Sequence, residues 1–297
     1  MIRLVMLPLA LFLSLCISAQ SVVLPVEEAP RSFSKGTYPS FQIDIPGATL
    51  KDIDKSWQKH IASGSKAKVE LVSGELVLAG AVNPNIAPAP LTIFSKLVDI
   101  PGFVRITAWF MLSDSVFVSR ERNNDQDLAT QKFVRDFALE AYRDVVKAEL
   151  KKEEGALKVL EKDLDNLIKE EDKAAKKIDE NKRAIQRAND NIATGNADIQ
   201  TVSYKISSQK EMVEKTSADK NANQGAKKTL KELENSKKSL QKGNETEAKS
   251  ITKMNAEIRD AERAIADAKE KQNLKLADIE KQKKKIAEVS DKLNGIR

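Results

Sequence analysis

Residues able to do chemistry are scarce in this chain of 297 residues. It contains one His and one Cys. A Cys–His nucleophilic site and a metal site with several His or Cys ligands are therefore nearly excluded. His60 stands directly before apolar Ile61 in a helical pattern, which favours a surface or packing role for its imidazole. Acid pairs such as Asp52 and Asp54 lie in no evident pocket, and neither common glycine-rich phosphate loop occurs. We expect no enzymatic activity, no metal and no cofactor.

One strand offers a candidate contact surface instead. In residues 103–112 an apolar face alternates with a second face that is only half apolar. The apolar face comprises Val104, Ile106, Ala108, Phe110 and Leu112. We expect something to cover the second face, and packing against the following helix is favoured over a ligand or interaction patch. The residues of such a patch would be Arg105, Trp109 and Met111.

Basic runs such as Lys151–Lys152 and Lys281–Lys285 raise the question of anionic partners. Acidic residues are interspersed with them, and aromatic residues for base stacking are missing from these segments. A solvated helix face is therefore favoured over a nucleic-acid surface. We expect protein partners, self-association included, and no nucleic acid.

Residues 1–19 have the pattern of a secretory signal peptide. Arg3 precedes an apolar run, and small residues lead to a cleavage position between Ala19 and Gln20. The run is shorter than the roughly 20 apolar residues of a membrane span. The single Cys, Cys16, follows a leucine rather than a small residue. A lipid anchor at Cys16, and with it membrane contact, is disfavoured. The predicted location is the periplasm or cell envelope.

The mature chain divides into two unlike parts. All nine prolines lie at or before Pro101, and Tyr204 is the only aromatic residue after Arg143. Residues 20–127 carry a net charge of −1, whereas residues 128–297 carry +6. This division predicts a small globular head followed by a charged helical region.

The first part predicts an α+β head at residues 40–148, after a proline-broken linker at residues 20–39. Five strands are expected, at 41–45, 66–72, 75–81, 91–98 and 103–112, with one helix after Thr49 and a short additional strand at 115–119. The order β-α-β-β-β-β indicates a single antiparallel sheet with one or two helices. The next helix begins near residues 124–127, and its wide apolar stripe over 128–148 places it on the sheet.

Heptad spacing of apolar residues predicts a coiled coil over residues 149–297. One phase runs over 157–213 and a second over 230–296. The stretch between them predicts a turn, so the region folds into an antiparallel hairpin about 100 Å long with its tip near 217–227. A second turn signal at 193–198 stays open. The favoured fold-back pairs Val213 with Leu230, Ile185 with Ile258 and Leu157 with Ile286.

Two phrases carry a family resemblance. FVRITAWFMLSDSVFVS at residues 103–119, then FVRDFALE at 133–140 and charged heptads, resemble an uncharacterised exported family of Bacteroidota. The context Ser18-Ala19-Gln20 is similar to the cleavage site of that family. The resemblance covers most of the mature chain and implies no activity. A separate likeness, of architecture alone, is to the periplasmic chaperone whose basic coiled-coil arms hold outer-membrane proteins.

These features favour a non-enzymatic envelope protein that acts as a scaffold, spacer or interaction module through a coiled-coil arm. One alternative is a holdase-type periplasmic chaperone with basic helical arms. Another is a small-ligand or glycan-binding head on a stalk, with Trp109 and the loop at 83–90 forming its site.

Overall fold

The computed structural model describes residues 22–297, and the predicted signal peptide lies outside them. Their contacts divide the chain into two units. The head unit consists of the described residues up to Leu157 together with Gln282–Arg297, and the hairpin unit consists of Lys158–Lys281. The predicted α+β head and antiparallel helical hairpin are confirmed.

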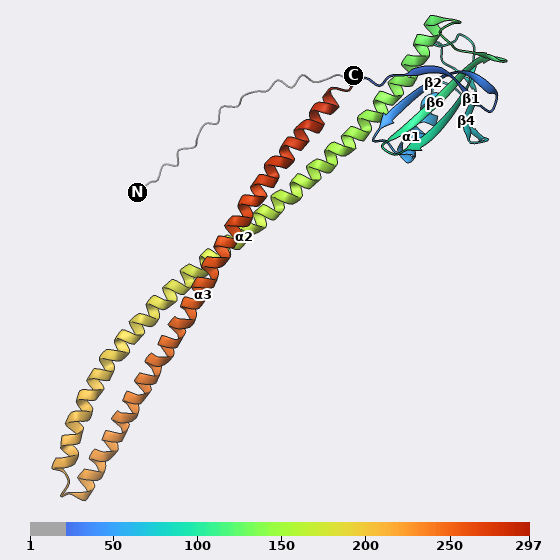
Figure 1. Cartoon of the computed structure of the whole chain (residues 1–297). Coiled ribbons are helices and arrows are strands. Elements are labelled where there is room, and N and C mark those ends of the chain that lie inside the picture. Colours follow the sequence, from blue (N-terminus) through green and yellow to red (C-terminus); the bar gives the residue numbers. More distant parts are fainter. Residues whose placement is uncertain (1–21) are drawn as a thin grey trace, which may run out of the picture. The chain divides into compact units, whose positions relative to one another are not determined.

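The head is built on an antiparallel sheet of seven strands (Figure 1). The sheet order is β1-β2-β6-β5-β4-β3, and β7 pairs with β6. Helix α1 connects β2 to β3, and α2 follows β7. The strands are β1 (Glu27–Phe33), β2 (Gly36–Pro46), β3 (Glu70–Val72), β4 (Glu75–Ala81), β5 (Leu91–Ile100), β6 (Phe103–Ser113) and β7 (Val116–Phe117). The helices are α1 (Leu50–Ile61), α2 (Asn124–Lys215) and α3 (Lys220–Asn294).

Two hairpin turns lie where the sequence predicts them. Ser73 and Gly74, between β3 and β4, have φ values of 51° and 81°. Two consecutive positive φ values characterise the two-residue turn that matches strand twist. Gly102, with φ 94°, closes the turn between β5 and β6. The strand before Ser73 is shorter than predicted, because pairing begins at Glu70 rather than at Lys66.

The predicted linker at residues 20–39 is wrong for much of its length, because β1 and the start of β2 form a hairpin there. Pro30 pairs with Pro39 in this hairpin. Proline lacks an N–H group and is tolerated in a strand where one side has no partner. Strand β1 is an edge strand, and β2 pairs with β6 only from Phe41 onwards. Both prolines therefore fit into the ladder, although they obscure it in the sequence.

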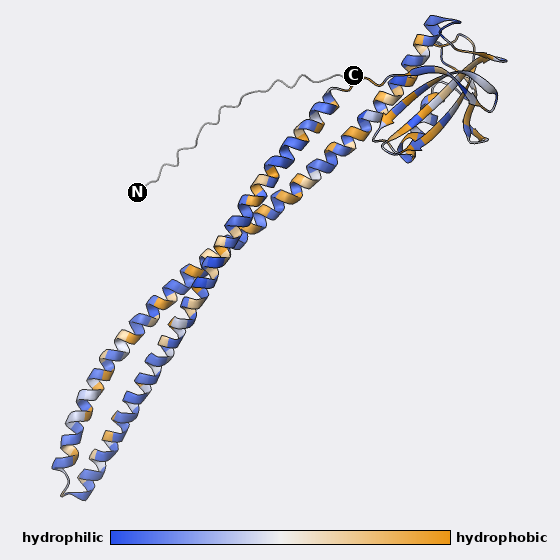
Figure 2. Ribbon diagram, in the orientation of Figure 1, coloured by the Kyte–Doolittle hydropathy of each residue, from blue (hydrophilic) through white to orange (hydrophobic). Residues whose placement is uncertain are grey.

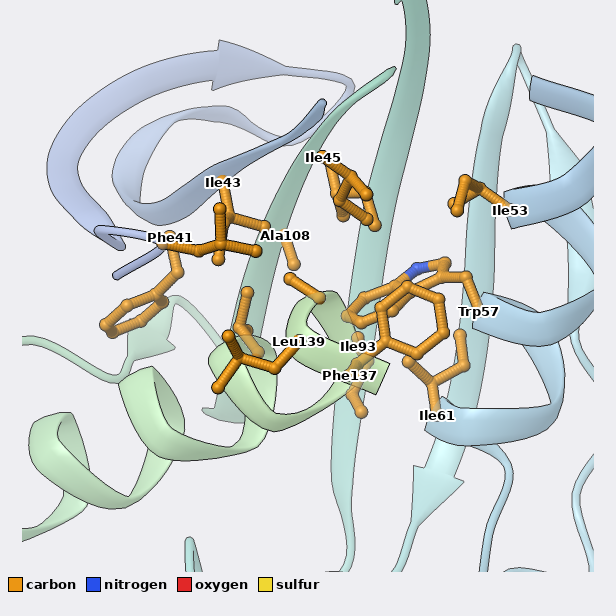
Figure 3. Packing of buried hydrophobic residues seen from close by; sticks show 14 of the residues in the cluster. Phe41, Ile43, Ile45, Ile53, Trp57, Ile61, Ile93, Ala108, Phe137 and Leu139 are labelled. Carbon is orange, nitrogen blue, oxygen red and sulfur yellow. The ribbon is translucent and has the colours of Figure 1, made fainter. Parts of the chain in front are cut away.

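The main core lies on one face of the sheet, where α1 and the start of α2 pack. Trp57 of α1 is fully buried, and its ring meets Phe137 of α2 edge-on at 4.9 Å between centroids. Figure 3 shows these two rings beside the side chains of Ile53 and Ile61. The predicted apolar face of β6 belongs to this core, with Val104, Ile106, Ala108 and Phe110 at 0% exposure. The prediction that the first turns of α2 rest on the sheet agrees with this packing.

Residues 282–297 group with the head unit, although the sequence assigned them to the hairpin. Val289 and Ile296 are buried in the main core. The Val22 N–H donates to the Gly295 carbonyl at 3.0 Å, and Val22 forms a parallel bridge with Ile296. The Arg143 guanidinium donates to the Ile296 carbonyl at 3.0 Å. Segments from distant parts of the sequence thus complete one core.

The hairpin unit consists of two antiparallel helical segments joined by a short turn. Every predicted heptad position within this unit is buried or half-buried, and Ile178, Ile258 and Ala261 form a buried apolar cluster. Figure 2 shows the same pattern as isolated apolar positions on largely hydrophilic helices. Helix α2 continues without interruption through residues 193–198, so the alternative turn there is wrong.

The turn spans residues 216–219, earlier than the centre of the predicted tip at 217–227. Helix α3 begins at Lys220 because Asp219 caps it: its carboxylate accepts the N–H groups of Asn221 and Ala222 at 3.0 and 3.2 Å. The Asn223 amide then donates to the Val213 carbonyl at 2.8 Å. Polar residues that resembled a loop are therefore helical, and the arms pair a few positions away from the predicted register.

Candidate functional site

Trp109, the centre of the predicted interaction patch, lies in the interior of the head. It is 2% exposed, and Phe33 of β1 stacks on its indole at 4.6 Å between centroids. The indole N–H donates to the Arg31 carbonyl at 3.2 Å. The expectation that the helix after β6 would cover Trp109 is wrong, because β1 covers it instead. Burial also leaves Trp109 no surface with which to contact a ligand.

The covering strand is fastened to the sheet at its turn. Glu75 of β4 accepts hydrogen bonds from the Ser34 N–H at 3.0 Å and from the Ser34 hydroxyl at 2.6 Å. Aromatic and apolar side chains fill the space beneath it: Phe33, Tyr38, Val77, Phe94, Trp109, Met111 and Phe117. This second cluster is a small core on the face of the sheet opposite α1.

The other two residues of the predicted patch, Arg105 and Met111, have different surroundings. Met111 packs against this second cluster and is half-buried. Arg105 forms a bidentate ion pair with Asp44 of β2, at 2.7 and 2.8 Å, and this hydrogen bonding raises the pKa of the guanidinium. The structure therefore gives all three residues packing or pairing partners within the head.

A groove between α1 and α2 is a concave surface of the head with a volume of about 510 Å³. Its floor is apolar, formed by Ile53 and by residues of α2. Carboxylates and one ammonium group line its rim. The lining residues are Asp52, Ile53, Ser56, Lys59, His60, Ser63, Phe137, Glu140, Ala141, Asp144, Val145 and Ala148. A ligand in this groove would meet more negative than positive charge.

His60 lines this groove and packs between aromatic rings. Its ring stacks on Phe133 at 4.2 Å and on Trp57 at 5.7 Å between centroids. The Nε2 atom lies 3.1 Å from the Phe133 carbonyl oxygen, to which a protonated Nε2 donates. Burial lowers the pKa of His60 below 6.5, while this hydrogen bond and the charges of Glu140 and Asp136 work against the shift. A neutral, packed imidazole is the form that the head favours.

The hairpin unit has its own groove, beside its seam. It has a volume of about 450 Å³ and lies between Asp163, Asn166 and Leu167 of α2 and Lys271, Leu274, Lys275 and Asp278 of α3. Leu274 is 64% exposed there. An ion pair between Lys275 and Asp163, at 3.2 Å, bridges the two arms at this level. Heptad counting did not single out Leu274, because the residue lies outside the seam positions.

Among residues 22–297 no cluster of three or more His, Cys, Asp or Glu side chains could hold a metal ion. Within the same range no helix has the length and apolar character needed to cross a membrane. A scan against protein-family models finds no match for the chain. A search of curated proteins finds none either.

Proposed function

We propose that the chain is a non-enzymatic, exported envelope protein that acts as a scaffold, spacer or interaction module through its helical hairpin. The observation that carries the proposal is the groove at Leu274, where an apolar side chain is 64% exposed inside a concave part of the coiled-coil surface. Exposed apolar side chains inside a concave surface are typical of protein contact sites. The charged exterior of both arms supports a role in water rather than in lipid.

The export part of the proposal rests on residues 1–19, and it predicts a mature chain that begins at Gln20. The resemblance to exported proteins of Bacteroidota supports the same location and also stays a proposal. Mass spectrometry of the protein from its own cell envelope fraction would measure the first residue. A chain that retains residue 1 would contradict cleavage.

Site-specific photo-crosslinking in intact cells tests the interaction role. A crosslinking amino acid would replace Leu274 in the hairpin groove, Tyr204 elsewhere on the hairpin, or Lys59 at the head groove. We expect crosslinked products from position 274, fewer from position 204 and none from position 59. Products confined to position 59 would overturn the hairpin as the interaction module.

The groove between α1 and α2 supports a second candidate function, a small-ligand-binding head. With Trp109 buried, this candidate now depends on His60 and its neighbours. Titration of small cationic and neutral compounds, followed by the His60 ring resonances, would test it.

Holdase activity is the remaining alternative; protection of a denatured outer-membrane protein from aggregation would support it.

A further inference from the structure

One stripe of exposed residues on α3 has a charge order that complements itself. The stripe contains Asp267, Lys271, Leu274, Asp278 and Lys281, spaced by three or four residues. Such spacing places side chains on one side of a helix. The order along these five residues is negative, positive, apolar, negative, positive, and exposed Glu270, four residues before Leu274, adds a further negative charge at the edge of the stripe. All five residues are exposed, and the three central ones line the hairpin groove.

The charges of this stripe have no partners inside the hairpin. Among residues 22–297, none of Asp267, Lys271, Asp278 and Lys281 forms an ion pair or side-chain hydrogen bond. The opposite side of α3 differs. Lys269 there pairs with Glu171 at 3.4 Å, and Glu280 and Lys283 have partners as well. The unpaired charges are thus concentrated on the side that carries Leu274.

A twofold axis close to Leu274 would place two copies of the stripe antiparallel to each other. Lys271 of one copy would then face Asp278 of the other, and Asp267 would face Lys281. Each contact occurs twice, so four pairs of opposite charge would flank the two Leu274 side chains. A parallel arrangement would instead bring each charge against its own kind. The stripe therefore complements a second copy in the antiparallel orientation alone.

We propose that the hairpin groove is the docking surface for a second copy of this chain, with α3 packed antiparallel against its counterpart and Leu274 at the twofold axis. The inference rests on the proposed interaction role of the hairpin and names its partner. An isologous contact is the commonest form of self-association. A stripe of about four helical turns buries less than a standard stable interface, so the dimer forms at high protein concentration and dissociates readily.

Two leucine variants of the full mature chain provide the first test, measured by sedimentation equilibrium from micromolar to millimolar concentration. Leu274→Glu places a charge at the axis and should weaken the dimer at least about a hundredfold. Leu276→Glu is the matched control, because Leu276 is 48% exposed and lies only two residues away, outside the stripe. The dissociation constant of the control should stay within about threefold of the wild type. Equal losses in both variants would overturn the docking surface.

Charge reversal provides the second test, because it predicts pairing between different variants. Lys271→Glu faces Asp278 with a like charge, and Asp278→Lys faces Lys271 in the same way. Each variant alone should dimerise about tenfold more weakly, and the double variant should recover. A mixture of the two single variants should form heterodimers, since every contact is then of opposite charge. Failure of both the mixture and the double variant would refute the twofold arrangement.

The outcomes separate this inference from the proposed function. A wild-type chain that stays monomeric up to millimolar concentration overturns the dimer. Crosslinks from position 274 to a different protein would in that case still support the interaction role. Crosslinks from position 274 exclusively to the same chain, lost in Leu274→Glu, support both proposals. Absence of any crosslink together with a monomeric chain would overturn both.

Discussion

At the residue scale, His60 is defined by its packing. Its ring lies against Phe133 and Trp57, and its Nε2 atom contacts a backbone carbonyl. Such an environment penalises the charged imidazolium because the ring is withdrawn from water. The nearby carboxylates of Glu140 and Asp136 compensate in part. His60 therefore acts as a packing residue whose protonation opposes folding, in agreement with the packing role that its sequence context favours.

The stability of the head should consequently fall on acidification through His60. Since its pKa is lowered in the folded state, the unfolded chain binds the proton first as the pH drops below about 6.5. The loss levels off below the folded-state pKa. His60→Gln removes this component, so the stability advantage of the wild type should shrink between pH 7.5 and pH 5. Urea unfolding of both proteins across that range measures it; an advantage that grows on acidification would contradict the argument.

The carboxylate of Glu140 should influence the pKa of His60. Glu140→Gln removes a charge that raises the pKa of His60, so the pKa should fall further. Because the chain has a single His, its ring resonances give an unambiguous titration by NMR. Asp99→Asn, near the end of β5, is the matched control and should leave the His60 titration unchanged. An unchanged pKa in Glu140→Gln would show that the charge is fully screened.

At the element scale, β1, the strand that covers Trp109, is the part of the head that the sequence pattern did not predict. Alternation in β6 reveals both of its faces, because the pattern is local. Which segment covers Trp109 depends on the pairing of β1 with β2. The prolines in both strands hide that pairing in the sequence. The seam of the hairpin was the most predictable feature, since a heptad repeat sustained over many turns requires no knowledge of the rest of the fold.

Removal of the Phe33 ring should uncover Trp109. Phe33→Ala deletes the stacked ring and its edge contacts with Phe94 and Phe117, which should cost about 2–4 kcal/mol of head stability. The emission of Trp109 should shift to longer wavelength, measured in a Trp57→Phe background. Phe103→Ala, on a half-exposed ring outside the second cluster, is the control. If the emission wavelength of Trp109 in Phe33→Ala stayed at its wild-type value, Phe33 would not be what covers Trp109.

The seam of the hairpin contains a polar contact that explains Gly195. The Asn244 side chain occupies the space beside this glycine, where an added Cβ would overlap its amide, and it donates to the Asn196 side chain at 2.8 Å. The turn signal at 193–198 was therefore misleading for a physical reason. Glycine there makes room across the seam within a continuous helix. A single polar contact of this kind can fix the register of paired helices.

Gly195→Ala should stabilise the hairpin less than Gly243→Ala does, because the new methyl group displaces the Asn244 amide and breaks its hydrogen bond to Asn196, which costs about 1 kcal/mol. In an Asn244→Ala background this penalty is absent, so Gly195→Ala should there gain the full helix propensity of alanine. Gly243→Ala is the control: nothing lies within 4 Å of its added Cβ, and higher helix propensity should stabilise it by up to about 1 kcal/mol. Thermal unfolding monitored by circular dichroism measures all four proteins. Additive effects of the two substitutions would contradict the contact.

At the scale of the whole molecule, the head core is assembled from segments that lie far apart in the sequence. Val22 forms a bridge with Ile296 and donates its N–H to the Gly295 carbonyl, and the Arg143 side chain donates to the Ile296 carbonyl. The sequence separation between Arg143 and Ile296 is 153 residues. Contacts of such separation are slow to form and follow local structure in folding. We therefore expect the sheet, α1 and the heptads to form early and the head core to close after the end of α3 has reached it.

Because Ile296 is buried in the main core, position 296 should contribute strongly to the stability of the head. Ile296→Ala should lower the unfolding free energy of the head by about 2–4 kcal/mol, because Ile296 is buried in its main core. Trp57, fully buried in the same core, reports that transition by fluorescence. Ile251→Ala, at a half-buried seam position of the hairpin unit, should reduce helix stability while leaving the Trp57 transition in place. If Ile251→Ala shifts the Trp57 transition as far as Ile296→Ala does, residues 282–297 have no special role in the head. If only Ile296→Ala shifts it, the head depends directly on the return of α3.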